Sequence, residues 1–121
     1  MDHRQFHRRR NTEALKKALA DGLLVVNTDT GEIRNKSGKV LKQTIEYYGY
    51  PSIYMRVDGV AHKFYVHKVV WLAAGNEIEE YKQIDHIDMD RTNASIRNLR
   101  LLSPSENLAR RQFKEKEELA F

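Results

Sequence analysis

The chain of 121 residues has no cysteine, two prolines and one tryptophan. Without cysteine there are no disulfide bonds and no thiolate metal sites, so any metal ion must be held by oxygen or imidazole ligands. No hydrophobic run approaches the roughly 20 residues that a transmembrane helix needs, and the N-terminal MDHRQFHRRR lacks the apolar segment of a secretory signal. We therefore expect a cytoplasmic protein with no membrane association and no disulfide-linked partner.

What the sequence does contain is charge, and that charge is unevenly distributed. Charged residues make up 31% of the chain and hydrophobic residues 40%, and 21 Lys and Arg against 17 Asp and Glu give a net charge of +4. The length favours a single domain. Basic residues cluster at the N-terminus and around residues 84–111. Such clusters are typical of polyanion binding, although they also occur on an ordinary solvated surface.

The first half of the sequence predicts a basic arm, a short helix and an antiparallel β region. Residues 1–10 have little to bury and are interpreted as an arm, and residues 11–20 as a helix that Asn11 or Thr12 caps. Alternating hydrophobic residues and turn sequences then predict strands, and Asp58-Gly59 is the clearest hairpin signal. The predicted strands are 23–26, 32–34, 40–45, 52–57 and 61–66.

A hydrophobic helix is predicted at residues 67–74, HKVVWLAA, with Gly75 as its end. We interpret His67, at its start, as a hydrogen-bonded structural residue rather than a ligand. Four tyrosines in the β region have two interpretations. We favour half-buried sheet residues over side chains that stack on bases or sugars. The four are Tyr47, Tyr48, Tyr50 and Tyr54.

The segment IDHIDMDRTNASIRNLRLLSPSEN, residues 84–107, concentrates polar groups beyond what folding requires. It predicts a strand at 83–87, a loop at 88–98, a second strand at 99–102 and then a helix. Ser103, Pro104 and Glu106 have the spacing of a capping box with proline at the first helical position. A hairpin packed on this helix would bring Asp85 and Asn107 together.

Asp85, His86 and Asn107 supply the groups that metal-assisted phosphodiester hydrolysis needs. Carboxylate and amide oxygens are ligands for a hard divalent cation, which stabilises charge at the phosphorus and the leaving oxygen. Neutral imidazole, with an ordinary pKa of about 6.5, can take a proton from an attacking water. The nearby arginines, including Arg110 and Arg111, are suited to holding phosphates.

A calcium-binding loop is the alternative for this segment. Asp88, Asp90 and Thr92 have the spacing of the first ligands of an EF-hand. However, Asn93 occupies the place of the required glycine and Leu99 that of the closing glutamate. We therefore interpret Asp88 and Asp90 as turn-forming residues rather than ligands.

The motifs IDHID and SPSEN, with Asn98 twelve residues after His86, resemble those of the HNH endonucleases. The resemblance is closest to the HNN-type, homing-endonuclease-like branch that is common in bacteriophage genomes. The preceding HKFYVHKVVWLAAG is similar to the strand and helix that lead into the motif in that branch, so the likeness covers roughly residues 52–112. It implies a ββα-metal fold and metal-dependent cleavage of DNA that leaves 5′-phosphate and 3′-hydroxyl ends.

The resemblance also implies roles for single residues. Asp85 and Asn107 correspond to the metal ligands, with Mg²⁺ as the expected ion and Mn²⁺ as the alternative. His86 corresponds to the general base, and Asn98 to the central asparagine that holds the loop and helps to orient His86 through hydrogen bonds. The chain departs from many relatives at Met89, where they often have glycine.

The sequence thus predicts an α+β protein with a small antiparallel β-sheet region followed by a helix and a ββα-metal (HNH) motif. Residues 1–22 form the arm and short helix, residues 23–66 the β region, and residues 67–121 the nuclease core. We expect the β region and the core to form one compact domain. The β region and the basic arm would supply any preference for a DNA sequence.

The predicted function is a DNA endonuclease that nicks or cuts double-stranded DNA as a monomer or weak dimer. It would act in the cytoplasm, or in the host cytoplasm if a phage encodes it. One alternative is a DNA-binding module on the same scaffold without catalysis, and another is a calcium-binding or interaction domain. The predicted DNA contacts are Arg8, Arg9, Arg10, Arg91, Arg97, Arg100, Arg110 and Arg111.

Overall fold

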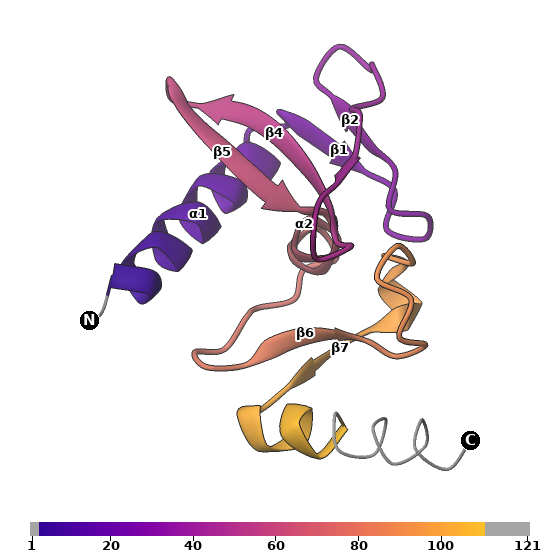
Figure 1. Cartoon of the computed structure of the whole chain (residues 1–121). Coiled ribbons are helices and arrows are strands. Elements are labelled where there is room, and N and C mark those ends of the chain that lie inside the picture. Colours follow the sequence, from indigo (N-terminus) through magenta and orange to yellow (C-terminus); the bar gives the residue numbers. More distant parts are fainter. Residues whose placement is uncertain (1–2, 111–121) are drawn as a thin grey trace.

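The computed structural model describes residues 3–110 and combines helices with small antiparallel sheets (Figure 1). This architecture confirms the predicted α+β class. Its elements in chain order are α1 (His3–Ala20), β1 (Leu24–Val26), β2 (Ile33–Asn35), β3 (Thr44–Ile45), β4 (Pro51–Val57), β5 (Val60–Tyr65), α2 (Val66–Ala73), β6 (Gln83–His86), the 3-10 helix η1 (Ile96–Asn98), β7 (Leu99–Leu102) and a helix that is described from 104 to 110.

The strands pair in three antiparallel groups, β1 with β2, β3 with β4 and β5, and β6 with β7. The predicted Asp58-Gly59 hairpin joins β4 to β5. Both residues have positive φ angles, 51° and 78°, as the tight hairpin turn that matches strand twist requires. The turn depends on the backbone preferences of its two central residues, so these two residues were enough to predict it.

The predicted strand at 40–45 is wrong over most of its length, because only Thr44 and Ile45 belong to β3. Before them, Val40 forms an isolated bridge with Arg34, and the Gln43 side chain donates to the carbonyl of Gly31 at 2.8 Å. Residues 40–43 therefore follow β2 as an irregular segment, and tertiary contacts replace the regular ladder that the alternating residues predicted.

The helix predicted at 11–20 begins eight residues earlier, at His3. Asn11 is therefore not an N-cap. Its side-chain amide donates to the carbonyl of Lys63 at 3.0 Å, and its amide oxygen accepts a hydrogen bond from Lys68 Nζ at 3.0 Å. Arginine and glutamine are good helix formers, and this anchored helix extends through the basic segment that was predicted to be an arm. Within the described residues, no helix is both long and hydrophobic enough to cross a membrane.

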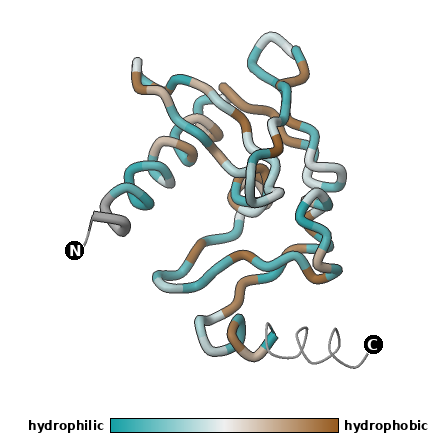
Figure 2. Tube along the Cα trace, in the orientation of Figure 1, coloured by the Kyte–Doolittle hydropathy of each residue, from teal (hydrophilic) through white to brown (hydrophobic). Residues whose placement is uncertain are grey.

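One cluster of buried side chains joins the helices to all three groups of strands. α2 lies between the three-stranded sheet and the β6–β7 hairpin (Figure 1), and hydrophobic segments gather around it and on β1 (Figure 2). The hairpin is thereby fixed to the rest of the protein. The cluster consists of Leu15, Ala18, Leu24, Ile33, Ile53, Val57, Phe64, Val66, Val69, Val70, Ala94 and Leu99.

Candidate active site

The β6–β7 hairpin is the frame of the candidate site. In its register Asp85 lies opposite Arg100 and His86 lies opposite Leu99. Because neighbouring side chains of a strand point to opposite faces, Gln83 and Asp85 share one face of β6 and His86 lies on the other. The predicted metal ligand and the predicted base are thus adjacent in sequence but separated by the strand.

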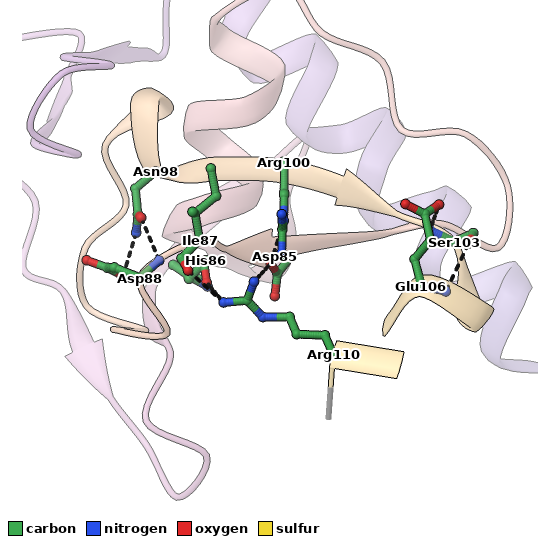
Figure 3. Close-up of polar contacts among 9 residues, drawn as sticks. All are labelled: Asp85, His86, Ile87, Asp88, Asn98, Arg100, Ser103, Glu106 and Arg110. Carbon is green, nitrogen blue, oxygen red and sulfur yellow. Dashed lines mark hydrogen bonds and ion pairs between the residues drawn. The ribbon is translucent and has the colours of Figure 1, made fainter. Parts of the chain in front are cut away.

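The helix from 104 to 110 begins with the predicted capping box. Ser103 Oγ accepts a hydrogen bond from the backbone N–H of Glu106 at 3.2 Å, and Glu106 Oε1 accepts one from the N–H of Ser103 at 3.3 Å (Figure 3). These bonds lower the pKa of Glu106. Two orphan amides are satisfied at once, which fixes where the helix starts and therefore where Asn107 lies.

One face of this helix covers the Gln83–Asp85 face of β6. Asn107 and Arg110 are three residues apart and so lie on the same side of the helix. The Asn107 amide donates to Gln83 Oε1 at 2.7 Å. The Arg110 guanidinium lies 3.1 Å from Asp85 Oδ2 and donates to the carbonyls of His86 and Ile87 at 2.9 and 2.7 Å.

Asp85 is held from two sides. Arg100 Nε donates to Oδ2 at 2.9 Å from across the hairpin, and Arg110 approaches the same oxygen from the helix (Figure 3). The Asp85 side chain is 16% exposed. Within residues 3–110 no hydrogen bond reaches its Oδ1, and none reaches the amide oxygen of Asn107. One carboxylate oxygen and one amide oxygen therefore remain available.

Carboxylate and amide oxygens are both ligand types that a hard divalent cation takes. Among the described residues no group of three carboxylate, imidazole or thiol side chains gathers into a metal site. An ion held by Asp85 and Asn107 would complete its shell with water and phosphate oxygens, as Mg²⁺ commonly does. The alternative for Asp88 and Asp90 was a calcium site built only from protein ligands. The described residues contain no cluster of acidic side chains that would form one.

His86 lies on the opposite side of β6 within a group of rings. It is buried, and its ring centroid lies 5.1 Å from that of His67 and 5.7 Å from that of Tyr50. Burial lowers the pKa of His86, although Asp85 and its other acidic neighbours act in the opposite direction. A neutral imidazole is the form that a general base needs.

The loop after β6 is organised by Asn98 and by two aspartates. Asn98 is buried, accepts a hydrogen bond from the N–H of Asp88 at 3.0 Å, and donates to Asp88 Oδ1 and the Asn93 carbonyl at 2.9 Å each. Hydrogen bonds from the Asn93 side chain, from the N–H of Asp90 and from Asn98 lower the pKa of Asp88. Asp90 Oδ1 accepts from the N–H and the hydroxyl of Thr92. Asp88 and Asp90 thus act as turn formers, as the sequence predicted.

Asn98 holds the loop but does not contact the His86 imidazole through any hydrogen bond in the described residues. It acts on His86 through the backbone, because its carbonyl accepts from the N–H of Ile87 at 2.8 Å. Met89 has a φ of 66°. Its N–H donates to the His86 carbonyl at 2.9 Å. The loop therefore turns sharply directly after the candidate base.

The arginines predicted to bind DNA fall into different environments. Arg100 and Arg110 are bound to Asp85, and the Arg110 side chain is only 17% exposed. Arg91 donates to the carbonyl of Tyr48 and lies 4.8 Å above the Tyr50 ring. Arg97 is 78% exposed and lies 3.5 Å from Asp29. The exposed residues of α1 include Arg8, Arg9 and Arg10, whereas Arg111 lies outside the described residues.

The ring cluster beside His86 was not predicted. Tyr50 is half-buried, as we favoured for the tyrosines, but that prediction is wrong for Tyr47, Tyr48 and Tyr54, which are exposed. The contact between Tyr50 and His86 joins segments far apart in the sequence, and no local signal indicates it. The one available hint was the histidine at the start of α2.

Two comparisons with known proteins found similarity to endonucleases. Residues 64–109 match a family model described as HNH endonuclease. The fold is similar to that of the HNH homing endonuclease I-HmuI, solved in a study of its DNA binding and cleavage. The TM-score is 0.70 and the sequence identity 32%, over 78% of this chain and 54% of I-HmuI. The chain therefore spans about half of that relative.

No protein of curated function matches the chain. The family match includes the hairpin, its loop and the start of the following helix. The segment that carries Asp85, His86, Asn98 and Asn107 therefore lies within the part of the chain that is similar to the HNH endonuclease family.

Proposed function

We propose that the protein is a metal-dependent endonuclease that hydrolyses phosphodiester bonds of double-stranded DNA. The observation that carries this proposal is β6, which holds a carboxylate with one free oxygen on one face and a buried imidazole on the other. The match of residues 64–109 to the HNH endonuclease family and the similarity to I-HmuI support a role in DNA cleavage or DNA binding.

In the proposed reaction, Asp85 Oδ1 and the amide oxygen of Asn107 would hold one divalent ion, Mg²⁺ or alternatively Mn²⁺. When bound, such an ion would supply charge stabilisation at the phosphorus and at the leaving oxygen. Arg100 and Arg110 hold the other carboxylate oxygen, so Asp85 is fixed before the ion binds. A ligand that is already oriented loses less entropy on binding.

His86 is the proposed general base. Its Nε2 is enclosed and without a partner, whereas Nδ1 is not enclosed in this way, so Nδ1 is the nitrogen left for a water molecule. Removal of a proton from that water lets its oxygen attack the phosphorus, and the P–O3′ bond breaks. The products carry a 5′-phosphate and a 3′-hydroxyl.

The exposed arginines are the proposed DNA contacts. Arg8, Arg9 and Arg10 on α1 and Arg97 on η1 are exposed, although Arg9 lies 3.8 Å from Glu80 and Arg97 3.5 Å from Asp29, whereas Arg110 is largely buried. Such contacts supply affinity without sequence preference and weaken as salt increases. With one site in each chain, we expect nicking as the first product, and dimerisation or a second nick for a double-strand break.

The test is cleavage of supercoiled plasmid with Mg²⁺ or Mn²⁺. We expect nicked circles that EDTA abolishes, and a His86→Ala variant that is slower by about 10²–10⁴-fold, the usual contribution of a general base. His62→Ala is the matched control, because His62 lies on β5 and stacks on Phe64 rather than on the site rings. Intact plasmid with every metal and several DNA substrates would refute the proposal.

A DNA-binding module without catalysis is the second candidate. It is favoured by the ion pairs that already occupy Asp85 Oδ2, because two guanidinium groups compete with a cation for this carboxylate. Mobility-shift binding of DNA by a chain that cuts under none of these conditions would select this candidate.

A further inference from the structure

Two imidazole nitrogens are buried without a partner. Within the described residues, Nδ1 of His67 and Nε2 of His86 are the enclosed side-chain nitrogen or oxygen atoms that make no hydrogen bond. An unsatisfied buried polar atom costs about 1–3 kcal/mol. The two atoms belong to rings in contact with each other, which makes each ring the nearest available partner of the other.

The packing around the rings limits what else could satisfy them. The His67 and His86 rings meet edge-on, with centroids 5.1 Å apart and planes at 78°. Tyr50 packs against both, at 5.2 Å from His67 and 5.7 Å from His86. Tyr65 stacks on His67 at 5.5 Å with nearly parallel planes. The pair is thus enclosed by aromatic faces, which offer no strong acceptor.

We propose that His67 is a positioning residue for His86. Neutral His86 carries its proton on Nε2, and this N–H donates a hydrogen bond to Nδ1 of His67. In the structure the two nitrogens are enclosed but not hydrogen-bonded to each other. A half-turn of the His67 imidazole about its Cβ–Cγ bond exchanges its ring nitrogens and carbons within nearly the same volume and leaves His86 in place, so the bond does not require the tyrosines to repack. One bond then satisfies both orphan atoms.

The consequence concerns the tautomer of His86. A neutral imidazole with its proton on Nε2 keeps the lone pair on Nδ1, the nitrogen that is not enclosed. That lone pair is what must accept the proton of an attacking water. This consequence rests on the proposed function, whereas the hydrogen bond itself does not.

His67 is suited to accept. Burial, together with His86 and Lys68, lowers the pKa of His67 to about 3. His67 therefore stays neutral over the pH range in which the protein would act. A charged imidazole has protons on both nitrogens and cannot accept.

The direct test uses the unaltered full chain, labelled with ¹⁵N. We expect nitrogen chemical shifts that place the proton of neutral His86 on Nε2, and a scalar coupling across the hydrogen bond to Nδ1 of His67. A proton on Nδ1 of His86 would overturn the proposal. A proton on Nε2 with no coupling to His67 would overturn it as well.

Variants connect the bond to catalysis. His67→Phe keeps a ring of similar size and removes the acceptor, and His67→Asn offers an amide oxygen near the position of Nδ1. We expect His67→Phe to mix the His86 tautomers and lower kcat on the order of 10- to 100-fold with KM unchanged, the usual cost of losing such a partner. His67→Asn should restore most of both properties.

His62→Phe is the matched control, because it replaces another stacked imidazole outside the cluster. It should change neither the His86 tautomer nor kcat. Equal tautomers in the unaltered chain and in His67→Phe would overturn the proposal. Absence of cleavage by the unaltered chain would refute the nuclease instead, because the nitrogen spectra are read without DNA or metal.

Discussion

Met89 has a backbone conformation that is unfavourable for a residue with a side chain, and it should therefore destabilise the loop. Its φ of 66° lies in the left-handed region, which costs a residue with a Cβ about 1–2 kcal/mol. We expect Met89→Gly to raise the free energy of unfolding by about 0.5–1 kcal/mol, since the greater freedom of glycine in the unfolded chain offsets part of the relief. Urea denaturation measures this. Met89→Ala is the control, because it keeps the Cβ and should not raise the free energy of unfolding. A Met89→Gly variant less stable than the unaltered chain would contradict the explanation.

His67 should make stability depend on pH. Its pKa is about 3 in the folded protein against 6.5 for an unperturbed imidazole, so the unfolded chain binds one more proton between these values. This contribution is complete above about pH 6.5 and is lost as the pH falls toward 3, by at most about 1.4 kcal/mol per pH unit.

Denaturation at several pH values checks this contribution. His67→Phe should flatten the slope over that window. Tyr65→Phe, which keeps the imidazole and its stacking neighbour's ring, should retain the slope. Besides His86, the charged neighbour of His67 is Lys68, whose own pKa burial lowers to about 8. Equal slopes for the unaltered chain and His67→Phe would show that His67 is not the group responsible.

At the same scale, the sequence could predict what depends on near neighbours. Asp88 and Asp90 were identified as turn formers because a short acidic side chain bonds to amides two residues on. The ring group of Tyr50, His67 and His86 was beyond reach, since three segments supply it and only packing brings them together. Arg110 was predicted to meet phosphate, and nothing in its neighbours indicated an ion pair with Asp85.

Among the elements, the helix that begins at Pro104 depends most on its cap. Ser103→Ala removes the bond to the Glu106 amide and should cost about 1 kcal/mol. Because the cap fixes the helix face that carries Asn107, the bond from Asn107 to Gln83 should weaken as well. Urea denaturation and the apparent metal affinity for cleavage measure the two effects.

Ser103→Thr is the matched variant, because a threonine hydroxyl can make the same bond. It should stay within about 0.5 kcal/mol of the unaltered chain. If Ser103→Ala and Ser103→Thr were equally stable, the capping box would not be what starts this helix.

The ends of helices and strands were predictable where the sequence contains a turn or a capping motif. The strand at 99–102 and the hairpin at Asp58-Gly59 have such signals, and both were predicted correctly. The start of α1 has none. Asn11 has the chemistry of a cap, but its side chain is used instead to bind Lys63 and Lys68 in other elements. Tertiary partners decided between two roles that the local sequence allowed equally.

For the whole molecule, the buried cluster predicts a single cooperative unit. Leu15 of α1 is fully buried in the same cluster as Leu99 of β7. Leu15→Ala should therefore lower the free energy of unfolding by about 2–5 kcal/mol and destabilise the hairpin together with α1. The fluorescence of Trp71 and far-UV circular dichroism should report one coincident transition.

Val25→Ala is the matched control, because Val25 is 57% exposed on β1. Its effect should stay within about 0.5 kcal/mol. Two separate transitions in the Leu15→Ala chain would mean that the segment with the β6–β7 hairpin folds apart from the N-terminal elements. The sequence suggested one domain from length and composition, but it did not indicate which helix closes the core.

The register of β6 against β7 decides more than the stability of a hairpin. A strand has a side-chain period of two, so a shift of the pairing by one residue would turn Asp85 toward the rings and His86 toward the arginines. An insertion or deletion in the loop between β6 and β7 therefore preserves the site only when it leaves the strand register unchanged. Natural variants should differ in loop length while keeping the same residues of β6 on each face of the hairpin. A variant whose register shifts by one residue should lose the proposed activity even though its sequence retains every candidate site residue.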